Sequence, residues 1–150
     1  MVAWGCRSLA ASPLKIDALV LESVYPTITE AVRNRISLRL GPLTDILTPA
    51  LLIQLKPRLQ IDPSQLCPID NIHDAGCPVL IAAGDCDRHT TLPETMRLFQ
   101  AANNPKQLVV FEGAAHQDLL AFDPGRYDKV LDFLNLHLTG NNSERPLRTE

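Results

Sequence analysis

The stretch PVLIAAGDCD, residues 78–87, decides the fold. Its run Val79–Ala83 is apolar at every position and has the length of a strand, and such unbroken runs are typical of strands buried on both faces of a parallel sheet. Gly84 ends the run, and two carboxylates, Asp85 and Asp87, follow it directly. We therefore expect a central strand with an acidic loop at its carboxyl end.

Two other apolar runs, residues 16–22 and 107–111, are also of strand length. Helical patterns separate the three runs, because capping-box signatures begin at Thr27, for a helix to about residue 40, and at Thr91. A further helix is predicted after Asp123, with apolar residues at i, i+3, i+4, i+7 and i+11. These are Tyr127, Val130, Leu131, Leu134 and Leu138. Strands that alternate with helices predict an α/β fold, with a parallel sheet of about three strands flanked by helices.

The remaining segments are less regular. Residues 1–11 contain several small residues among apolar ones and are predicted to form a helix. Thr48 followed by Pro49 has the pattern of a helix start. Residues 57–77 hold three prolines, three aspartates and Asn71, which predicts a long connection with one short helical turn.

The composition is that of a folded globular domain. The chain has 150 residues, of which 45% are hydrophobic and 21% charged, and a domain of this length buries about 68–70% of its unfolded surface. The formal net charge is -3, so we expect no nucleic-acid partner, because phosphate neutralisation favours a basic surface. No apolar run approaches the roughly 18–20 residues that span a bilayer, so we expect no membrane segment in this chain.

The N-terminal residues lack the pattern of a secretory signal, because Arg7 lies inside their apolar stretch. Four cysteines, Cys6, Cys67, Cys77 and Cys86, could form two disulfides. Three of them lie in or beside apolar stretches, and the chain is long enough to fold without disulfides. We therefore expect reduced, buried thiols and a cytoplasmic location.

Polar residues follow two of the predicted strands, in the segments 84–89 (GDCDRH) and 112–116 (EGAAH). The carboxyl ends of parallel strands meet at one edge of a sheet, where functional residues gather. A carboxylate from the first segment and a histidine from the second are therefore expected to meet. In acyl transfer a histidine accepts the proton of the nucleophile, and a carboxylate fixes the tautomer of the histidine.

A metal site is the other reading of these side chains. Asp85, Asp87 and His89 alternate along one segment, and Cys67, His73, Cys77 and Cys86 could be placed around zinc. Neither set has the paired, close spacing of structural zinc sites, so we expect no metal. His73 and His137 are expected at the surface.

The order of these segments resembles the α/β-hydrolase superfamily, in particular its bacterial serine-hydrolase members, over residues 1–138. Residues 17–23 (DALVLES) resemble the strand after the nucleophile helix, residues 78–87 the penultimate strand with its acid loop, and residues 111–116 (FEGAAH) the last strand with its histidine loop. The resemblance implies Asp87 as the triad acid, ahead of Asp85, and His116 as the general base, with no cofactor. His89 is expected at the loop surface, with a hydrogen bond near the site as the alternative. The polar residues 139–150 are expected to form a flexible tail.

One part of the family pattern is missing, the Gly-x-Ser-x-Gly nucleophile elbow. Ser8 follows Gly5 by three residues but lies within a predicted helix, and Ser23 is expected to cap a turn. The resemblance therefore implies a serine upstream of Met1, in a hydrolase of small-molecule carboxylic esters, thioesters or amides of which this chain is the C-terminal half. The alternative is a non-catalytic, truncated hydrolase-like protein or binding module. In either case the cut sheet would expose an edge through which the chain self-associates.

Residues 28–60 lie where the family inserts a cap or lid over the active site. The stretch is rich in leucine and holds five cations: Arg33, Arg35, Arg39, Lys56 and Arg58. A lid would favour an apolar acyl group, and the arginines could attract an anionic one. An ordinary amphipathic helix pair with a solvated basic face is the equal alternative.

Overall fold

A three-stranded parallel sheet lies at the centre of the computed structural model, which describes residues 16–139. The strands are β1 (Leu19–Glu22), β2 (Val79–Gly84) and β3 (Lys106–Phe111), and they lie side by side in that order. Both neighbouring pairs are parallel. The predicted α/β class and sheet of three strands are therefore confirmed.

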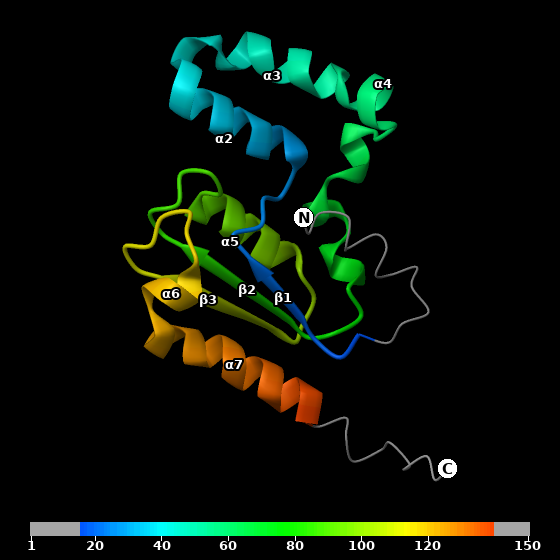
Figure 1. Cartoon of the computed structure of the whole chain (residues 1–150). Coiled ribbons are helices and arrows are strands. Elements are labelled where there is room, and N and C mark those ends of the chain that lie inside the picture. The colour runs from blue at the N-terminus through cyan, green and yellow to red at the C-terminus, as the bar shows by residue number, and fades with distance from the viewer. Residues whose placement is uncertain (1–15, 140–150) are drawn as a thin grey trace, which may run out of the picture.

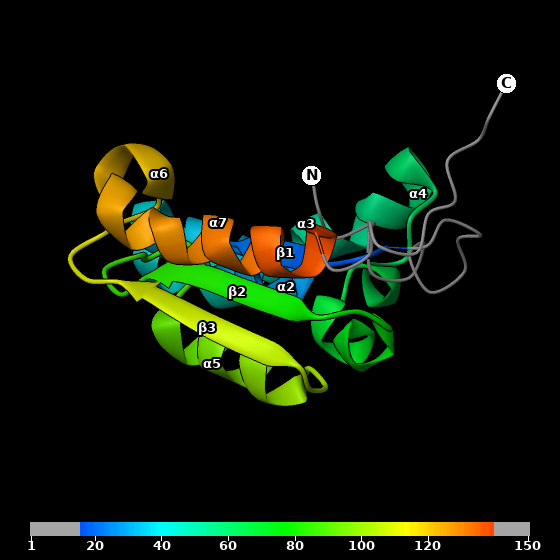
Figure 2. The same cartoon turned by 90° about the horizontal axis from the view of Figure 1, so that it is seen from below.

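Helices cover both faces of this sheet. Helix α5 (Leu92–Ala101) lies on one face and α7 (Pro124–Thr139) on the other (Figure 2). Successive residues of β2 pack into opposite layers, since side chains alternate along a strand. The α5 layer contains Leu21, Val24, Ile72, Val79, Ile81, Leu98 and Ala102. The α7 layer contains Leu80, Ala82, Val109, Phe111, Ala114, Leu119, Val130 and Phe133. Every residue of β2 is buried as a result.

A polar contact joins helix α7 to the edge strand β1. The Tyr127 hydroxyl donates a hydrogen bond to the carboxylate of Glu22 at the end of β1. This bond, more than the partial burial of the ring, raises the pKa of Tyr127 to about 12. The edge of β1 that faces away from β2 has no strand partner within residues 16–139.

The chain segment that connects β1 to β2 forms a separate group of helices to one side of the sheet (Figure 1). It comprises α2 (Ile28–Leu40), the 3-10 turn η1 (Gly41–Leu43), α3 (Thr44–Ile53) and α4 (Leu55–Leu59). Thr27 caps α2 as predicted, because its hydroxyl accepts a hydrogen bond from the Glu30 amide at 3.2 Å. We call Ile28–Leu59 the cap segment.

Two local predictions in this region are wrong. Helix α3 begins at Thr44 and contains Pro49, whereas the sequence pattern placed the start at Thr48. The turn η1 leads straight into α3, so the helix is already under way when Pro49 is reached. Residues 57–77 are also more structured than predicted. They hold the end of α4 and the 3-10 helices η2 (Pro63–Gln65), η3 (Pro68–Asp70) and η4 (Ile72–Asp74), two of which begin at a proline whose fixed φ suits a helical turn.

By length and composition alone, the helical stretch Ile28–Arg58 could cross a membrane, and 17% of its most apolar window is buried. The stretch is not straight, however. It turns back at Gly41–Leu43, so that α2 and α3 lie side by side (Figure 1). Neither helix alone has the roughly 20 residues that a bilayer requires.

Two predictions fall on the chain ends. The predicted helix at residues 1–11 lies outside the described residues. The predicted tail at residues 139–150 overlaps them only at Thr139, which is the last residue of α7.

Candidate active site

Asp87 lies on the loop after β2, and its carboxylate has no exposed surface. One oxygen, Oδ1, accepts hydrogen bonds from the backbone N–H groups of His89 at 2.7 Å and Thr90 at 3.0 Å. The other oxygen, Oδ2, lies 2.8 Å from Nδ1 of His116. The carboxylate is therefore fixed by its own loop and directed at the histidine from the next loop.

His116 follows β3, and its side chain is 40% exposed. An ionised carboxylate only accepts hydrogen bonds, so the contact with Asp87 places the imidazole proton on Nδ1. Nε2 then carries a lone pair, and the structure gives it no hydrogen-bond partner within residues 16–139. A lone pair on an accessible Nε2, backed by a buried carboxylate, can accept a proton from a hydroxyl group.

Two hydrogen bonds join the loop after β2 to the loop after β3. Cys86 N–H donates to the Ala114 carbonyl at 3.0 Å, and the carboxylate of Asp85 accepts from Gly113 N–H at 2.7 Å. Gly84 permits this approach, because a Cβ on it would lie 2.7 Å from the Ala114 carbonyl carbon and 2.9 Å from its Cβ. Of the two aspartates, Asp87 meets the histidine and Asp85 binds the backbone of the histidine loop.

His89 lies closer to the site than its loop position suggested. Its half-buried ring is tilted by 58° against the ring of His116, with 4.9 Å between the centroids. Its Nδ1 is buried and has no hydrogen-bond partner in the described part of the chain. The expectation of a loop-surface residue is therefore wrong, and no local sequence signal distinguishes a ring that packs on a second loop.

Neither of the two other candidate serines, Ser23 and Ser8, is placed as a nucleophile in the described residues. Ser23 follows β1 with φ at +46°, and its carbonyl accepts a hydrogen bond from the Thr90 hydroxyl at 3.1 Å. Its own Oγ is buried and unpaired among the described residues, so the side chain does not cap a turn. Ser8 lies outside the described residues.

Cys67 and Cys86 are free thiols, but Cys86 is exposed, and Cys67 and Cys77 are only partly buried. The prediction of buried thiols is therefore wrong for Cys86 and holds only in part for the other two. Cys86 lies between Asp85 and Asp87 on the loop that joins β2 to α5 (residues 85–91), which we call the acid loop. Its hydrogen bond to Asp85 and the charge of that carboxylate raise the pKa of the Cys86 thiol. The protonated thiol is a poor nucleophile, which argues against a cysteine mechanism. Within residues 16–139, no cluster of histidine, cysteine and carboxylate side chains could hold a metal ion.

The cap segment contacts the acid loop directly, through a residue that the sequence did not single out. The side-chain amide of Asn34 on α2 donates to the His89 carbonyl at 3.2 Å and to the Glu94 carboxylate at 2.9 Å. Glu94 also accepts the Thr91 N–H at 2.8 Å, which completes the predicted capping box of α5. The first half of the cap segment is therefore anchored to the loop that carries Asp87.

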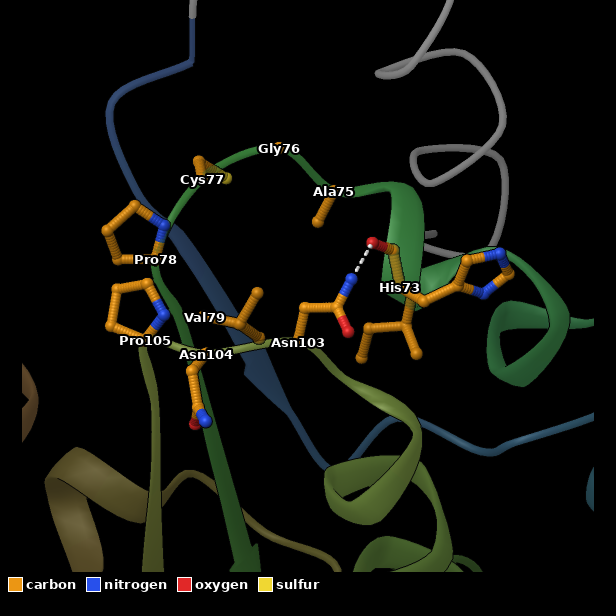
Figure 3. A pocket seen from close by; sticks show the side chains of 10 residues that line it. His73, Ala75, Gly76, Cys77, Pro78, Val79, Asn103, Asn104 and Pro105 are labelled. Carbon is orange, nitrogen blue, oxygen red and sulfur yellow. Dashed lines mark hydrogen bonds between the residues drawn. The ribbon is translucent and has the colours of Figure 1, made fainter.

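A separate cavity of about 330 Å³ lies at the opposite end of the sheet, where β2 and β3 begin (Figure 3). Asn103 donates to the His73 carbonyl there at 2.8 Å, while the His73 ring points away from the other labelled side chains (Figure 3). The His73 side chain is 50% exposed, in agreement with its predicted surface position. This cavity shares no residue with the loops that carry Asp87 and His116.

No protein-family model and no curated protein sequence matches the chain. Solved structures do match it. An esterase of Pyrococcus furiosus aligns with a TM-score of 0.60 and 17% identity, over 91% of this chain and 50% of the esterase. The esterase domain of a Rhodothermus marinus protein aligns with a TM-score of 0.56 and 19% identity, over 89% of this chain and 54% of the domain.

A monoacylglycerol lipase of Paleococcus ferrophilus also aligns, with a TM-score of 0.54 and 21% identity, over 88% of this chain and 63% of the lipase. The chain spans about half the length of the two esterases. All three proteins have the α/β-hydrolase fold, and this chain aligns with part of each at a TM-score above 0.5. The chain therefore has a partial α/β-hydrolase fold.

Proposed function

We propose that this chain supplies the acid, Asp87, and the general base, His116, of a serine-type hydrolase that acts on small-molecule carboxylic esters, thioesters or amides. The observation that carries the proposal is the 2.8 Å contact between a fully buried carboxylate and a partly exposed imidazole. The pair lies at the carboxyl ends of two neighbouring parallel strands, where open α/β sheets bind their ligands.

In the proposed reaction, Nε2 of His116 accepts the proton of a serine hydroxyl as the serine oxygen attacks the substrate carbonyl. Asp87 stabilises the resulting imidazolium through Nδ1. His116 then donates the proton to the leaving group, and the acyl group remains on the serine. A water molecule, deprotonated by the same Nε2, releases the acid and restores the serine.

We place the nucleophile in a segment upstream of Met1. The sequence contains no Gly-x-Ser-x-Gly elbow, and the buried Oγ of Ser23 is not available to an external substrate. The amides that would stabilise the oxyanion belong in this family to the residue after the nucleophile and to an earlier loop, so they would lie in the same upstream segment.

Fluorophosphonate labelling of the product of the complete reading frame tests the proposal. We expect one labelled serine in the upstream segment, with labelling reduced about a thousandfold or more in His116→Ala. His73→Ala is the matched control, because His73 is an exposed histidine at the other end of the sheet, and it should label like the wild type. Labelling at Ser23, or equal labelling of both variants, would refute the proposed roles.

The alternative is a non-catalytic, truncated hydrolase-like protein, and the absence of an elbow in the sequence is the observation that favours it. This alternative predicts a stop codon in frame just before Met1 and no label on the 150-residue chain. An upstream strand that ends in Gly-x-Ser-x-Gly within about ten codons supports the hydrolase.

A further inference from the structure

A second cavity, of about 370 Å³, lies between the cap segment and the acid loop. Its lining consists of four residues from α2 and one from the loop: Arg35, Ile36, Arg39, Leu40 and His89. We call it the arginine pocket. Helix α2 lies over the loop that joins β2 to α5 (Figure 1), and Asn34 on α2 donates a hydrogen bond to that loop.

The arginine pocket is adjacent to the proposed base. His89 forms one wall of the pocket, and its ring centroid lies 4.9 Å from that of His116. A ligand group held in the pocket would therefore be separated from His116 by a single imidazole ring. This spacing suits one end of a small molecule whose other end reacts at His116.

No carboxylate among residues 16–139 forms an ion pair with the two arginines of the pocket, Arg35 and Arg39. Arg35 donates to the Ala31 carbonyl at 3.0 Å. The carboxylates around α2 already have other partners. Asp45 binds Arg33 at 2.8 Å, Glu30 binds Arg97 at 2.6 Å, and Glu94 binds Asn34.

The pocket is also rigidly placed. Asn34 joins α2 to the His89 carbonyl, and the neighbouring Ile36 is only 8% exposed. The two arginine side chains thus extend from a helix that is hydrogen-bonded to the loop beside His116.

We propose that the arginine pocket binds a carboxylate on the acyl part of the substrate, so that the enzyme prefers half-esters of dicarboxylic acids to neutral esters. Guanidinium groups match the two oxygens of a carboxylate. Ile36 and Leu40 supply apolar surface for the methylene chain between that carboxylate and the ester. This inference rests on the proposed function, because it names the substrate class of the same site.

Paired esters of equal chain length test this preference in the product of the complete reading frame. Mono-p-nitrophenyl adipate and p-nitrophenyl hexanoate differ only in a terminal carboxylate in place of a methyl group. A series from the succinate to the sebacate half-ester, each with its neutral counterpart, covers the unknown spacing. We expect the ratio of kcat/KM, anionic over neutral, to exceed about tenfold at the best length and to fall as salt screens the charges. A ratio of one or less at every length overturns the proposal.

Single substitutions test whether the preference for anionic esters depends on the arginine pocket. Arg35→Gln and Arg39→Gln are each expected to lower the anionic-over-neutral ratio about fivefold, chiefly through KM. Arg33→Gln is the matched control, because Arg33 lies on the same helix, is exposed and is paired with Asp45, and it should keep the wild-type ratio. An equal loss of selectivity in Arg33→Gln would show a general charge effect and would also overturn the proposal.

A binding measurement separates this inference from the proposed function. If no serine is labelled by the fluorophosphonate and no ester, thioester or amide is hydrolysed, the proposed function fails, and the pocket is then tested by titrating the protein with adipate. We expect saturable NMR shifts of the His89 ring that Arg39→Gln abolishes. The absence of such shifts in the wild type would refute the pocket itself.

Discussion

The Asp87 carboxylate has no exposed surface, whereas the His116 imidazole that contacts it at 2.8 Å is 40% exposed. The acid is thus fixed by two backbone N–H groups inside the protein, and the base is presented at the surface. This division suits a pair in which one member orients the other and only the second meets a substrate.

Asp87→Asn tests the effect of Asp87 on the orientation and tautomer of His116 separately from its effect on folding. Asp87→Asn can still accept the N–H groups of His89 and Thr90 through its amide oxygen, but its amide nitrogen then donates to Nδ1 of His116. That contact moves the imidazole proton to Nε2 and removes the base, so we expect kcat to fall about 10⁴-fold with the fold retained. Nitrogen-15 NMR of the His116 ring should report the change of tautomer.

Asp87→Ala gives the complementary result. It leaves two buried N–H groups unpaired, and each costs about 1–3 kcal/mol of unfolding free energy. Denaturation in urea should therefore show a clear loss of stability for Asp87→Ala and a much smaller one for Asp87→Asn. Equal stability of the two variants would contradict the role of the carboxylate as a backbone acceptor.

Gly84→Ala tests the close approach of the two loops. The added Cβ would lie 2.9 Å from the Cβ of Ala114 and still closer to its backbone, so the histidine loop must shift. We expect a loss of about 3 kcal/mol in the free energy of unfolding. Gly125→Ala is the control, since its Cβ would meet nothing closer than Asp123 at 3.7 Å. A Gly84→Ala variant as stable as Gly125→Ala would show that the loop accommodates the group freely.

Asn34→Ala removes the bond between α2 and the acid loop. The variant loses a hydrogen bond to a carboxylate that is 9% exposed, and we expect a loss of about 1.5 kcal/mol. Amide hydrogen exchange should become faster along α2. Ser37→Ala, on an exposed position of the same helix, should leave both quantities within error of the wild type. Unchanged exchange in Asn34→Ala would mean that other contacts anchor the helix.

The pH dependence of alkylation at Cys86 follows from its neighbour. Because Asp85 raises the pKa of the Cys86 thiol, its reaction with iodoacetamide should have a midpoint above that of an ordinary thiol. Asp85→Asn removes the negative charge, so the midpoint should move to lower pH. Peptide mapping by mass spectrometry distinguishes Cys86 from the other thiols, and a midpoint that stays in place would exclude Asp85 as the cause.

One edge of β1 has no strand partner within residues 16–139, which predicts self-association of the 150-residue chain. Light scattering after gel filtration should show oligomers whose size grows with concentration. Adding an upstream segment that supplies the neighbouring strand should suppress them. A monodisperse, cooperatively melting monomer would show that the edge is protected without a further strand.

The sequence was informative where a pattern is local. The apolar run of β2 predicted a doubly covered strand, and strand ends in a parallel sheet predicted that a carboxylate of residues 84–89 and a histidine of residues 112–116 would meet. The family resemblance narrowed this pair to Asp87 and His116. Capping boxes placed the starts of α2 and α5 correctly. Each of these signals lies within a few consecutive residues.

The parts that were missed depend on packing between distant segments. Asn34 and Glu94 are 60 residues apart, and neither belongs to a motif that names the other as a partner. His89 is a loop residue by sequence, and only the meeting of two loops places its ring on His116. The pattern Thr48-Pro49 predicts a helix start, but α3 begins earlier, at Thr44, because the turn η1 leads directly into it.

The attachment of Asn34 to the acid loop also divides the cap segment into a part that can be exchanged and a part that cannot. A graft that replaces Gly41–Leu59 leaves the anchor of the acid loop in place, whereas one that begins at Ile28 removes it. Cap segments of other lengths or chemistries should therefore be accepted when they are joined after α2. Exchange at that junction would preserve the hydrogen bonds that hold Asp87. On the proposed function, such chimaeras would test whether residues 41–59 affect which substrates are accepted.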